Sequence, residues 1–122
     1  MTRILVIDDH DIFRTWMRVA LELEGYTVEE ACDGRQGIAR HRADPADLII
    51  TDILMPEKDG LEIIQELRQE FPVSKIMAIS GGGQSGQINL LPVARTFGVV
   101  CTLWKPFTRC ELYAAVEKVL QS

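Results

Sequence analysis

The feature that most constrains this chain is a short apolar run, residues 48–51, that stops at a single aspartate. The run, Leu-Ile-Ile-Thr, is rich in β-branched residues and has the length of a buried strand. Asp52 follows where that strand is expected to end, and Pro56 and Gly60 then predict a turn. A carboxylate buried at this position is costly unless it is paired or bound to a cation. Because ligands of open α/β sheets bind at this end of parallel strands, Asp52 is a candidate site residue.

Further apolar runs alternate with segments of helical periodicity along the rest of the chain. Strands are expected at residues 3–7, 26–31, 75–79 and 99–103, in addition to 48–51. Helices are expected at residues 12–24 and 35–42. Two further helices are expected after capping boxes: one follows the box at 59–62 and ends at Pro72, and the other follows the box at 108–111. This alternation predicts an α/β domain with a parallel sheet that is covered by helices on both faces.

The segment between the fourth and fifth predicted strands has two interpretations. Three consecutive glycines, residues 81–83, are too flexible to begin a helix. We therefore expect a loop over residues 81–88 and a short helix over 90–97, with Asn89 as its N-cap and Pro92 in its first turn. The alternative is a longer, kinked helix that begins at Ser85.

Length and composition narrow the class of protein. The chain has 122 residues, enough for one domain, and is 47% hydrophobic and 25% charged, as in ordinary globular proteins. Its net charge of -5 argues against direct binding to nucleic acid or to anionic membranes. We expect a cytoplasmic location, since neither a membrane span nor a signal peptide is visible. Three widely spaced cysteines, Cys32, Cys101 and Cys110, are expected to be reduced thiols.

Polar side chains follow four of the five predicted strands. They are Asp8 and Asp9, Asp52, Ser80, and Lys105. In a parallel sheet these strand ends share one edge, where three carboxylates would repel one another unless a cation is present. Mg²⁺ prefers oxygen ligands, an ammonium and a hydroxyl suit phosphate oxygens, and an aspartate can act as a nucleophile toward phosphorus. Each residue alone has an ordinary role as a cap, turn or solvated charge, but together they predict an aspartate that is phosphorylated with the help of a metal.

His10 and the glycines at 81–83 lie near these polar residues in the sequence but are not expected to bind a metal or a phosphate. His10 is expected to be a surface residue, because no second histidine or cysteine lies at ligand spacing from it. The glycines at 81–83 do not belong to a P-loop, because no GxxxxGK[ST] motif follows.

The chain resembles the receiver domain of bacterial two-component response regulators. The resemblance rests on five segments in this order: ILVIDD, Asp33-Gly34, LIITDILMPEKDG, AIS and KPF. The resemblance runs from about residue 4 to residue 120. It implies a (βα)₅ doubly wound, five-stranded parallel sheet of the flavodoxin-like, CheY-like type. It also implies that residues 1–122 form a single receiver domain, which acts as a signalling switch rather than as an enzyme.

By that resemblance, Asp52 accepts a phosphoryl group from a phosphohistidine on a sensor histidine kinase or a histidine phosphotransfer protein. The metal, Mg²⁺ or Mn²⁺, would be bound by Asp9, Asp52 and the backbone carbonyl of Leu54, while Asp8 would help through water. Autophosphorylation by small donors and autodephosphorylation at Asp52 are expected with the metal.

The resemblance also assigns the phosphate contacts and the output. Ser80 and Lys105 would contact the phosphoryl oxygens, and the peptide bond before Pro106 is expected to be cis. Phosphorylation would shift the surface around the last strands and helices toward a downstream effector or a missing output domain. Homodimerisation is a further expectation.

Three features depart from the family pattern. Thr102 stands where the family usually has an aromatic switch residue, three positions before the lysine, and Trp104 is expected on the other side of that strand. The segment of chain between Ser80 and Lys105 is a few residues longer than in chemotaxis-type receivers. No effector domain follows Ser122, so we expect a stand-alone regulator or a receiver cut from a longer protein.

Two other functions compete with the phosphorylatable switch. A haloacid-dehalogenase-like phosphatase also uses an aspartate and Mg²⁺, but it would require a DxD pair after the first strand and a cap domain. A pseudo-receiver would bind partners without phosphorylation. The intact set of Asp8, Asp9, Asp52, Ser80 and Lys105 argues against it.

Overall fold

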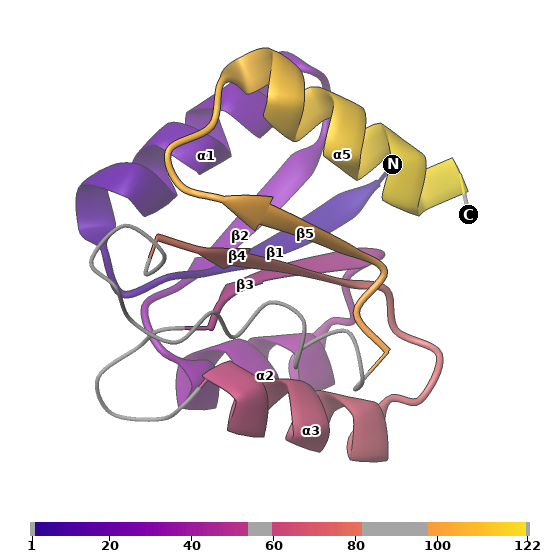
Figure 1. Ribbon diagram of the computed structural model, residues 1–122. Coiled ribbons are helices and arrows are strands. Elements are labelled where there is room, and N and C mark those ends of the chain that lie inside the picture. The colour runs from indigo at the N-terminus through magenta and orange to yellow at the C-terminus, as the bar shows by residue number, and fades with distance from the viewer. Residues whose placement is uncertain (1, 54–59, 82–97, 122) are drawn as a thin grey trace.

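The fold is a three-layer arrangement around one parallel sheet. A computed structural model describes residues 2–53, 60–81 and 98–121. Its five strands all run parallel in the order β2-β1-β3-β4-β5, with α1 and α5 on one face and α2 and α3 on the other (Figure 1). The strands are β1 (Arg3–Ile7), β2 (Thr27–Ala31), β3 (Leu48–Asp52), β4 (Ile76–Ser80) and β5 (Cys101–Trp104). The helices are α1 (Asp11–Leu23), α2 (Gly34–Ala43), α3 (Gly60–Glu70) and α5 (Arg109–Gln121). The predicted α/β fold with a five-stranded parallel sheet is confirmed.

Strand β3 lies at the centre of the sheet and all five of its residues are buried. Ile50 belongs to the apolar cluster beneath α1 and α5, whereas Ile49 belongs to the cluster beneath α2 and α3. Alternate side chains therefore fill both layers, which explains why the first three residues of the strand are all apolar instead of alternating with polar residues. Asp52 extends this buried strand to its last position.

Side chains cap the starts of α2 and α5, and the capping box at residues 108–111 is present as predicted. Asp33 caps α2, since its carboxylate accepts a hydrogen bond from the backbone N–H of Gln36 at 2.8 Å. The capping box before α5 is formed in both directions: the Thr108 N–H donates to Glu111 at 2.9 Å, and the Glu111 N–H donates to the Thr108 hydroxyl at 3.1 Å.

The Asp33-Gly34 pair also sets how closely α2 packs. A β-carbon at Gly34 would collide with the Ile63 side chain of α3. Glycine is therefore needed at this position for close approach, not for an unusual backbone angle.

The observed strands extend slightly further toward their carboxyl ends than predicted. β3 includes Asp52, β4 includes Ser80 and β5 includes Trp104. Backbone pairing continues into this region, because the Lys105 N–H donates to the Ser80 carbonyl at 2.8 Å. The polar residues that the sequence places after the strands are thus held by the sheet itself.

Several predictions lie outside the described residues. They are the Leu54 carbonyl, the turn at Pro56, the Asp59 cap, and the helix expected within residues 85–97. Within the described ranges, no helix has the length and apolar character needed to cross a membrane.

Candidate functional site

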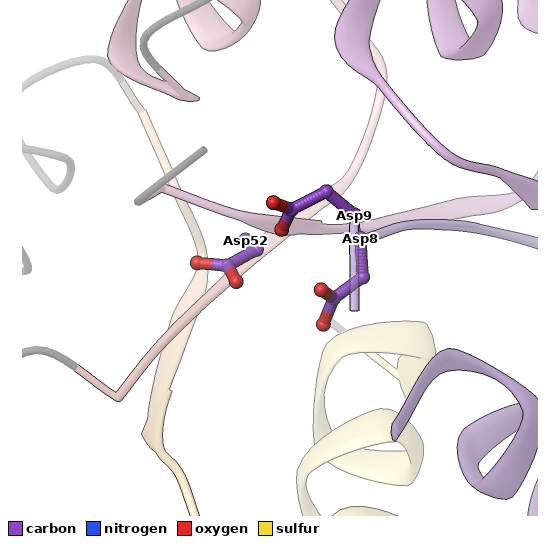
Figure 2. A group of neighbouring side chains, drawn as sticks. All are labelled: Asp8, Asp9 and Asp52. Atoms are coloured by element: carbon purple, nitrogen blue, oxygen red, sulfur yellow. The ribbon is translucent and has the colours of Figure 1, made fainter. Parts of the chain in front are cut away.

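Three carboxylates meet at the carboxyl edge of the sheet. Asp8 and Asp9 follow β1 and Asp52 ends β3, two strands that pair directly through Ile7 and Thr51. One oxygen from each carboxylate lies within 4.8 Å of the others, and Figure 2 shows the three side chains gathered at the two strand ends. Asp8 and Asp52 are buried, with 0% and 4% of their surface exposed, while Asp9 is exposed. The acidic pocket predicted from the sequence is therefore present.

The start of α1 orients Asp8. One carboxylate oxygen, Oδ1, accepts a hydrogen bond from the backbone N–H of His10 at 2.9 Å. The backbone carbonyl of Asp8 accepts a second hydrogen bond from the Arg14 guanidinium at 2.6 Å. His10 itself is the N-cap of α1, because its Nδ1 accepts from the Phe13 N–H at 3.2 Å. Its ring nitrogen is thus engaged in capping, which supports a structural role.

Lys105 brings a positive charge to the two buried carboxylates. Its Nζ lies 2.8 Å from Asp8 Oδ2 and 2.9 Å from Asp52 Oδ2, and only 17% of its side chain is exposed. Burial acts to lower the pKa of Lys105, but its attraction to the carboxylates of Asp8 and Asp52 outweighs burial and raises the pKa above its usual value. The lysine is therefore held as an ammonium that offsets the negative charge of the pocket.

The donor set of the pocket suits a divalent cation. All three ligating groups are carboxylates, which are the oxygen ligands preferred by hard cations. The buried Asp8 Oδ2 forms an ion pair with Lys105 but accepts no well-aligned hydrogen bond, so it retains capacity for a further electrostatic partner. These residues therefore fit a divalent metal.

Ser80 and Lys105 lie at the same edge of the sheet as the acidic pocket. Ser80 is the last residue of β4 and is 2% exposed. In the adjacent strand pair, Asp52 is in register with Ile79, one residue before Ser80. The Lys105–Pro106 peptide bond is cis. The structure therefore brings together Asp8, Asp9, Asp52, Ser80 and Lys105, which are separated by up to about a hundred residues in the sequence.

The prediction that Trp104 and Thr102 lie on opposite sides of β5 is wrong. Cys101 and Leu103 pack against the cluster beneath α1 and α5. Because side chains alternate along a strand, Thr102 and Trp104 share the other face. Trp104 is in register with Ser80 and 41% exposed, so an exposed aromatic lies one strand away from the site serine.

The aromatic residues beside Lys105 had no predicted role in the site. The Lys105 ammonium lies over the ring of Phe13, 4.6 Å from its centroid. Phe13, Trp16 and Phe107 contact one another, with ring centroids 5.3 to 5.9 Å apart. Phe13 lies in the first predicted helix, but a position within one helix does not reveal a contact with a residue 92 positions later in the chain.

Comparisons with known proteins agree with the geometry of the site. A sequence model of the family described as "Response regulator receiver domain" matches residues 4–117. The chain is 31% identical over 120 residues to the transcriptional regulatory protein ResD of Bacillus subtilis, covering 98% of this chain and 48% of that protein. The chain spans about half the length, or less, of the curated relatives it matches first.

Two solved structures show the same fold. A response regulator receiver domain protein (CheY-like) from Methanospirillum hungatei superposes with a TM-score of 0.90 at 25% identity, covering 99% of this chain and 94% of that one. The response regulator protein TrrA from Thermotoga maritima, solved in complex with Mg(2+)-BeF, superposes with a TM-score of 0.83 at 28% identity, covering 98% of this chain and 99% of that one.

Proposed function

The chain belongs to the family of response regulator receiver domains, a family of signalling modules, and we propose that its Asp52 accepts a phosphoryl group from a phosphohistidine on a partner protein. The observation that carries this proposal is the position of Asp52. It is a buried carboxylate at the end of the central strand, beside two further carboxylates and 2.9 Å from a lysine ammonium. We also propose that residues 1–122 act as one receiver domain.

The transfer exchanges one bond to phosphorus for another. A carboxylate oxygen of Asp52 forms the new O–P bond while the N–P bond of the phosphohistidine breaks, and the departing imidazole nitrogen keeps the electron pair. Lys105, which pairs with Asp52 in the unmodified state, then pairs with the phosphoryl oxygens. The Ser80 hydroxyl donates a hydrogen bond to the same group. Attack by water on the acyl phosphate would later regenerate Asp52.

We propose that Asp8, Asp9 and Asp52 hold Mg²⁺, or Mn²⁺, together with the backbone carbonyl of Leu54. The oxygen-only donor set and the buried Asp8 Oδ2 support this assignment. A divalent cation bound there offsets the negative charge that gathers between the carboxylates and the phosphoryl oxygens. The complex of TrrA with Mg(2+)-BeF, a relative of the same fold, supports the choice of Mg²⁺.

An apolar stripe on α1 offers a surface for the phosphohistidine donor, which we take to be a sensor histidine kinase or a histidine phosphotransfer protein. Ile12, Val19 and Leu23 are 80%, 44% and 68% exposed, and the half-buried Trp16 lies between the first two. Their spacing of four, three and four residues is that of a seam that packs against another helix. Because α1 begins two residues after Asp9, a helix docked there would lie next to the pocket.

Transfer of a phosphoryl group from such a donor would place the domain in the cytoplasm.

We propose that the output surface lies around β4, β5 and α5. The backbone bond from the Lys105 N–H to the Ser80 carbonyl joins the ends of β4 and β5. On phosphorylation, Ser80 and Lys105 change their side-chain partners, and this change acts on adjacent strand ends. It shifts the balance between two conformations of this surface, one of which is recognised by an effector, an output domain or a second copy of the chain.

Incubation with Mg²⁺ and acetyl phosphate, followed by intact-mass measurement, tests the proposed function. We expect one added phosphoryl group in the wild type and none in Asp52→Asn or in wild-type protein with the metal chelated. Asp44→Asn is the matched control, because Asp44 is an exposed aspartate that pairs with Arg3 away from the pocket, and this variant should be phosphorylated normally. A wild-type protein that gains no mass would overturn the proposal and favour a pseudo-receiver.

A further inference from the structure

The Lys105 ammonium contacts an aromatic face as well as two carboxylates. Its Nζ lies over the ring of Phe13, 4.6 Å from the centroid, while the same atom lies 2.8 and 2.9 Å from Asp8 and Asp52. This distance is within the range in which the quadrupole of a ring attracts a cation, and the attraction is stronger when the cation is largely desolvated. With 17% of its side chain exposed, Lys105 meets that condition.

The ring of Phe13 is held in place by its neighbours. It packs edge-to-face against Phe107, with centroids 5.3 Å apart and planes at 84°, and lies 5.5 Å from the ring of Trp16. The Phe13 N–H donates to the N-cap residue His10, so its backbone is fixed at the start of α1. Phe107 follows Lys105 by two residues and is 7% exposed. The ring cluster therefore connects the first turn of α1 to the loop that carries the lysine.

The two kinds of contact differ in how they respond to phosphorylation. The ion pairs of Lys105 with Asp8 and Asp52 must be exchanged when Asp52 becomes an acyl phosphate. The contact with Phe13 involves no group that is modified, so it persists while the anionic partner changes. A long lysine side chain otherwise loses considerable rotamer entropy when it is fixed against a new partner.

We propose that Phe13 is a positioning residue for Lys105, whose ring face keeps the ammonium beside Asp52 so that it meets the phosphoryl oxygens with little rearrangement. The inference rests on the proposed function, because Lys105 has phosphoryl oxygens to meet only if Asp52 accepts the group. It adds a residue of α1 to the machinery that stabilises the transferred phosphoryl group.

Substitutions that separate the ring face from apolar bulk test the role of Phe13. Phe13→Leu removes the π face, and we expect kcat/KM for phosphorylation by acetyl phosphate to fall by about threefold to tenfold. Phe13→Tyr keeps the face and should stay within about twofold of the wild type. Phe13→Met provides a second, flexible replacement without a ring and should behave like Phe13→Leu. Phe71→Leu is the matched control, since it replaces the same kind of ring with leucine in the other apolar cluster, where Phe71 packs against His41 away from Lys105.

A spectroscopic readout without any phosphodonor makes the test independent of turnover. The ¹H resonances of the Lys105 ε-methylene should be shifted upfield by the ring current in the wild type, Phe13→Tyr and Phe71→Leu, and this shift should be lost in Phe13→Leu and Phe13→Met. If the wild type is phosphorylated and Phe13→Leu reacts equally fast, the positioning role is refuted while the proposed function stands. Equal slowing in Phe13→Leu and Phe13→Tyr, or in Phe13→Leu and Phe71→Leu, would assign the effect to packing and also refute it. If the wild type accepts no phosphoryl group, both proposals fall.

Discussion

Lys105 and a divalent cation compete for the same carboxylates. The ammonium pairs with Asp8 and Asp52, two of the three groups that would hold the metal. Two positive charges cannot both approach these oxygens closely without repulsion, which amounts to about 4 kcal/mol for unit charges 4 Å apart at an effective dielectric constant of 20. Binding of the metal would therefore weaken the ion pairs of Lys105 with these oxygens, which leaves the ammonium available to a phosphoryl group beside Asp52.

Removal of the lysine charge should strengthen metal binding. In Lys105→Met the stem is kept and the competing ammonium is lost, so we expect the affinity for Mg²⁺ or Mn²⁺ to rise by about tenfold or more. Isothermal titration calorimetry with the metal alone measures this. Lys118→Met, the same change at an exposed position of α5, should bind the metal like the wild type. Unchanged or weaker binding by Lys105→Met would show that lysine and metal do not compete.

The ionisable members of the pocket could be identified from the sequence because each follows a strand of a parallel sheet. Alternation of strands and helices is enough to place Asp8, Asp9, Asp52 and Lys105 at one edge. Phe13 could not be identified in this way, because a cation–π contact depends on the path of the chain after β5 and leaves no spacing signature. The sequence interpretation also misplaced Trp104 relative to Thr102, although alternation along a strand requires the two to share a face.

Among the elements, the edge strand β2 shows how charged residues can be part of a strand. Glu30 accepts hydrogen bonds from Arg14 and Arg18 of α1, at 2.9 and 2.6 Å, whereas Glu29 pairs with Arg3 and Arg40, at 2.9 and 3.1 Å. Burial acts to raise the pKa of Glu29, but hydrogen bonds from Arg40 and Arg3 lower it below its usual value. The arginines that pair with these consecutive glutamates come from other elements, β1, α1 and α2. Charged side chains on an edge strand also discourage pairing with other chains.

The helices α2 and α3 are joined through a buried histidine. His41 is 2% exposed and packs edge-to-face on Phe71, with centroids 4.5 Å apart. Its Nδ1 accepts from the Ala46 N–H at 3.0 Å, which assigns the proton to Nε2, and Nε2 lies 3.2 Å from the Ser74 hydroxyl. Burial lowers the pKa of His41, and the nearby charge of Glu70 only partly opposes this effect. The neutral ring is thus the form that the fold accommodates.

Acid should therefore weaken the fold through His41. The pKa of His41 is lower in the folded chain than in the unfolded chain, so the unfolded chain binds more protons between the two values. The free energy of unfolding therefore falls as the pH drops through this window, which begins near pH 6.5. One such proton contributes a slope of at most about 1.4 kcal/mol per pH unit. Urea unfolding of the wild type and of His41→Gln between pH 7.5 and 5.5 measures the difference, and the variant should lose less stability than the wild type over this range.

A matched control changes a neutral side chain on the surface. Gln65→Asn alters an exposed residue of α3 that binds no proton in this range and should keep the wild-type pH dependence. If His41→Gln and the wild type lose stability in parallel as the pH falls, proton binding by His41 has no part in acid sensitivity.

For the molecule as a whole, periodicity was sufficient to predict an α/β fold. Five apolar runs alternating with amphipathic helices leave few arrangements that bury both faces of a sheet. The strand order β2-β1-β3-β4-β5 did not follow from the residues alone, because crossovers of either direction satisfy the same hydrophobic pattern. The family resemblance implied the doubly wound type of sheet. Strand ends were placed too early at Ser80 and Trp104, since hydrogen bonding between strands continues past the last apolar residue.

The proposed function of the whole molecule depends on one covalent bond, between phosphorus and a carboxylate oxygen of Asp52. In this proposal the other groups of the pocket support that bond: Asp8 and Asp9 fit the metal, Lys105 supplies positive charge, and Phe13 positions the lysine. Neither of the other two aspartates of the pocket is expected to take its place, because Asp8 is oriented by the His10 N–H and Asp9 is exposed.

The most direct test is to locate the phosphoryl group. Protein incubated with Mg²⁺ and acetyl phosphate is treated with borohydride, which reduces an acyl phosphate to the alcohol, and the site is mapped by peptide mass spectrometry. We predict homoserine at position 52 and at no other aspartate. Homoserine at Asp8 or Asp9, or its absence from position 52 in protein that has gained a phosphoryl group, would contradict the assignment of Asp52 as the acceptor.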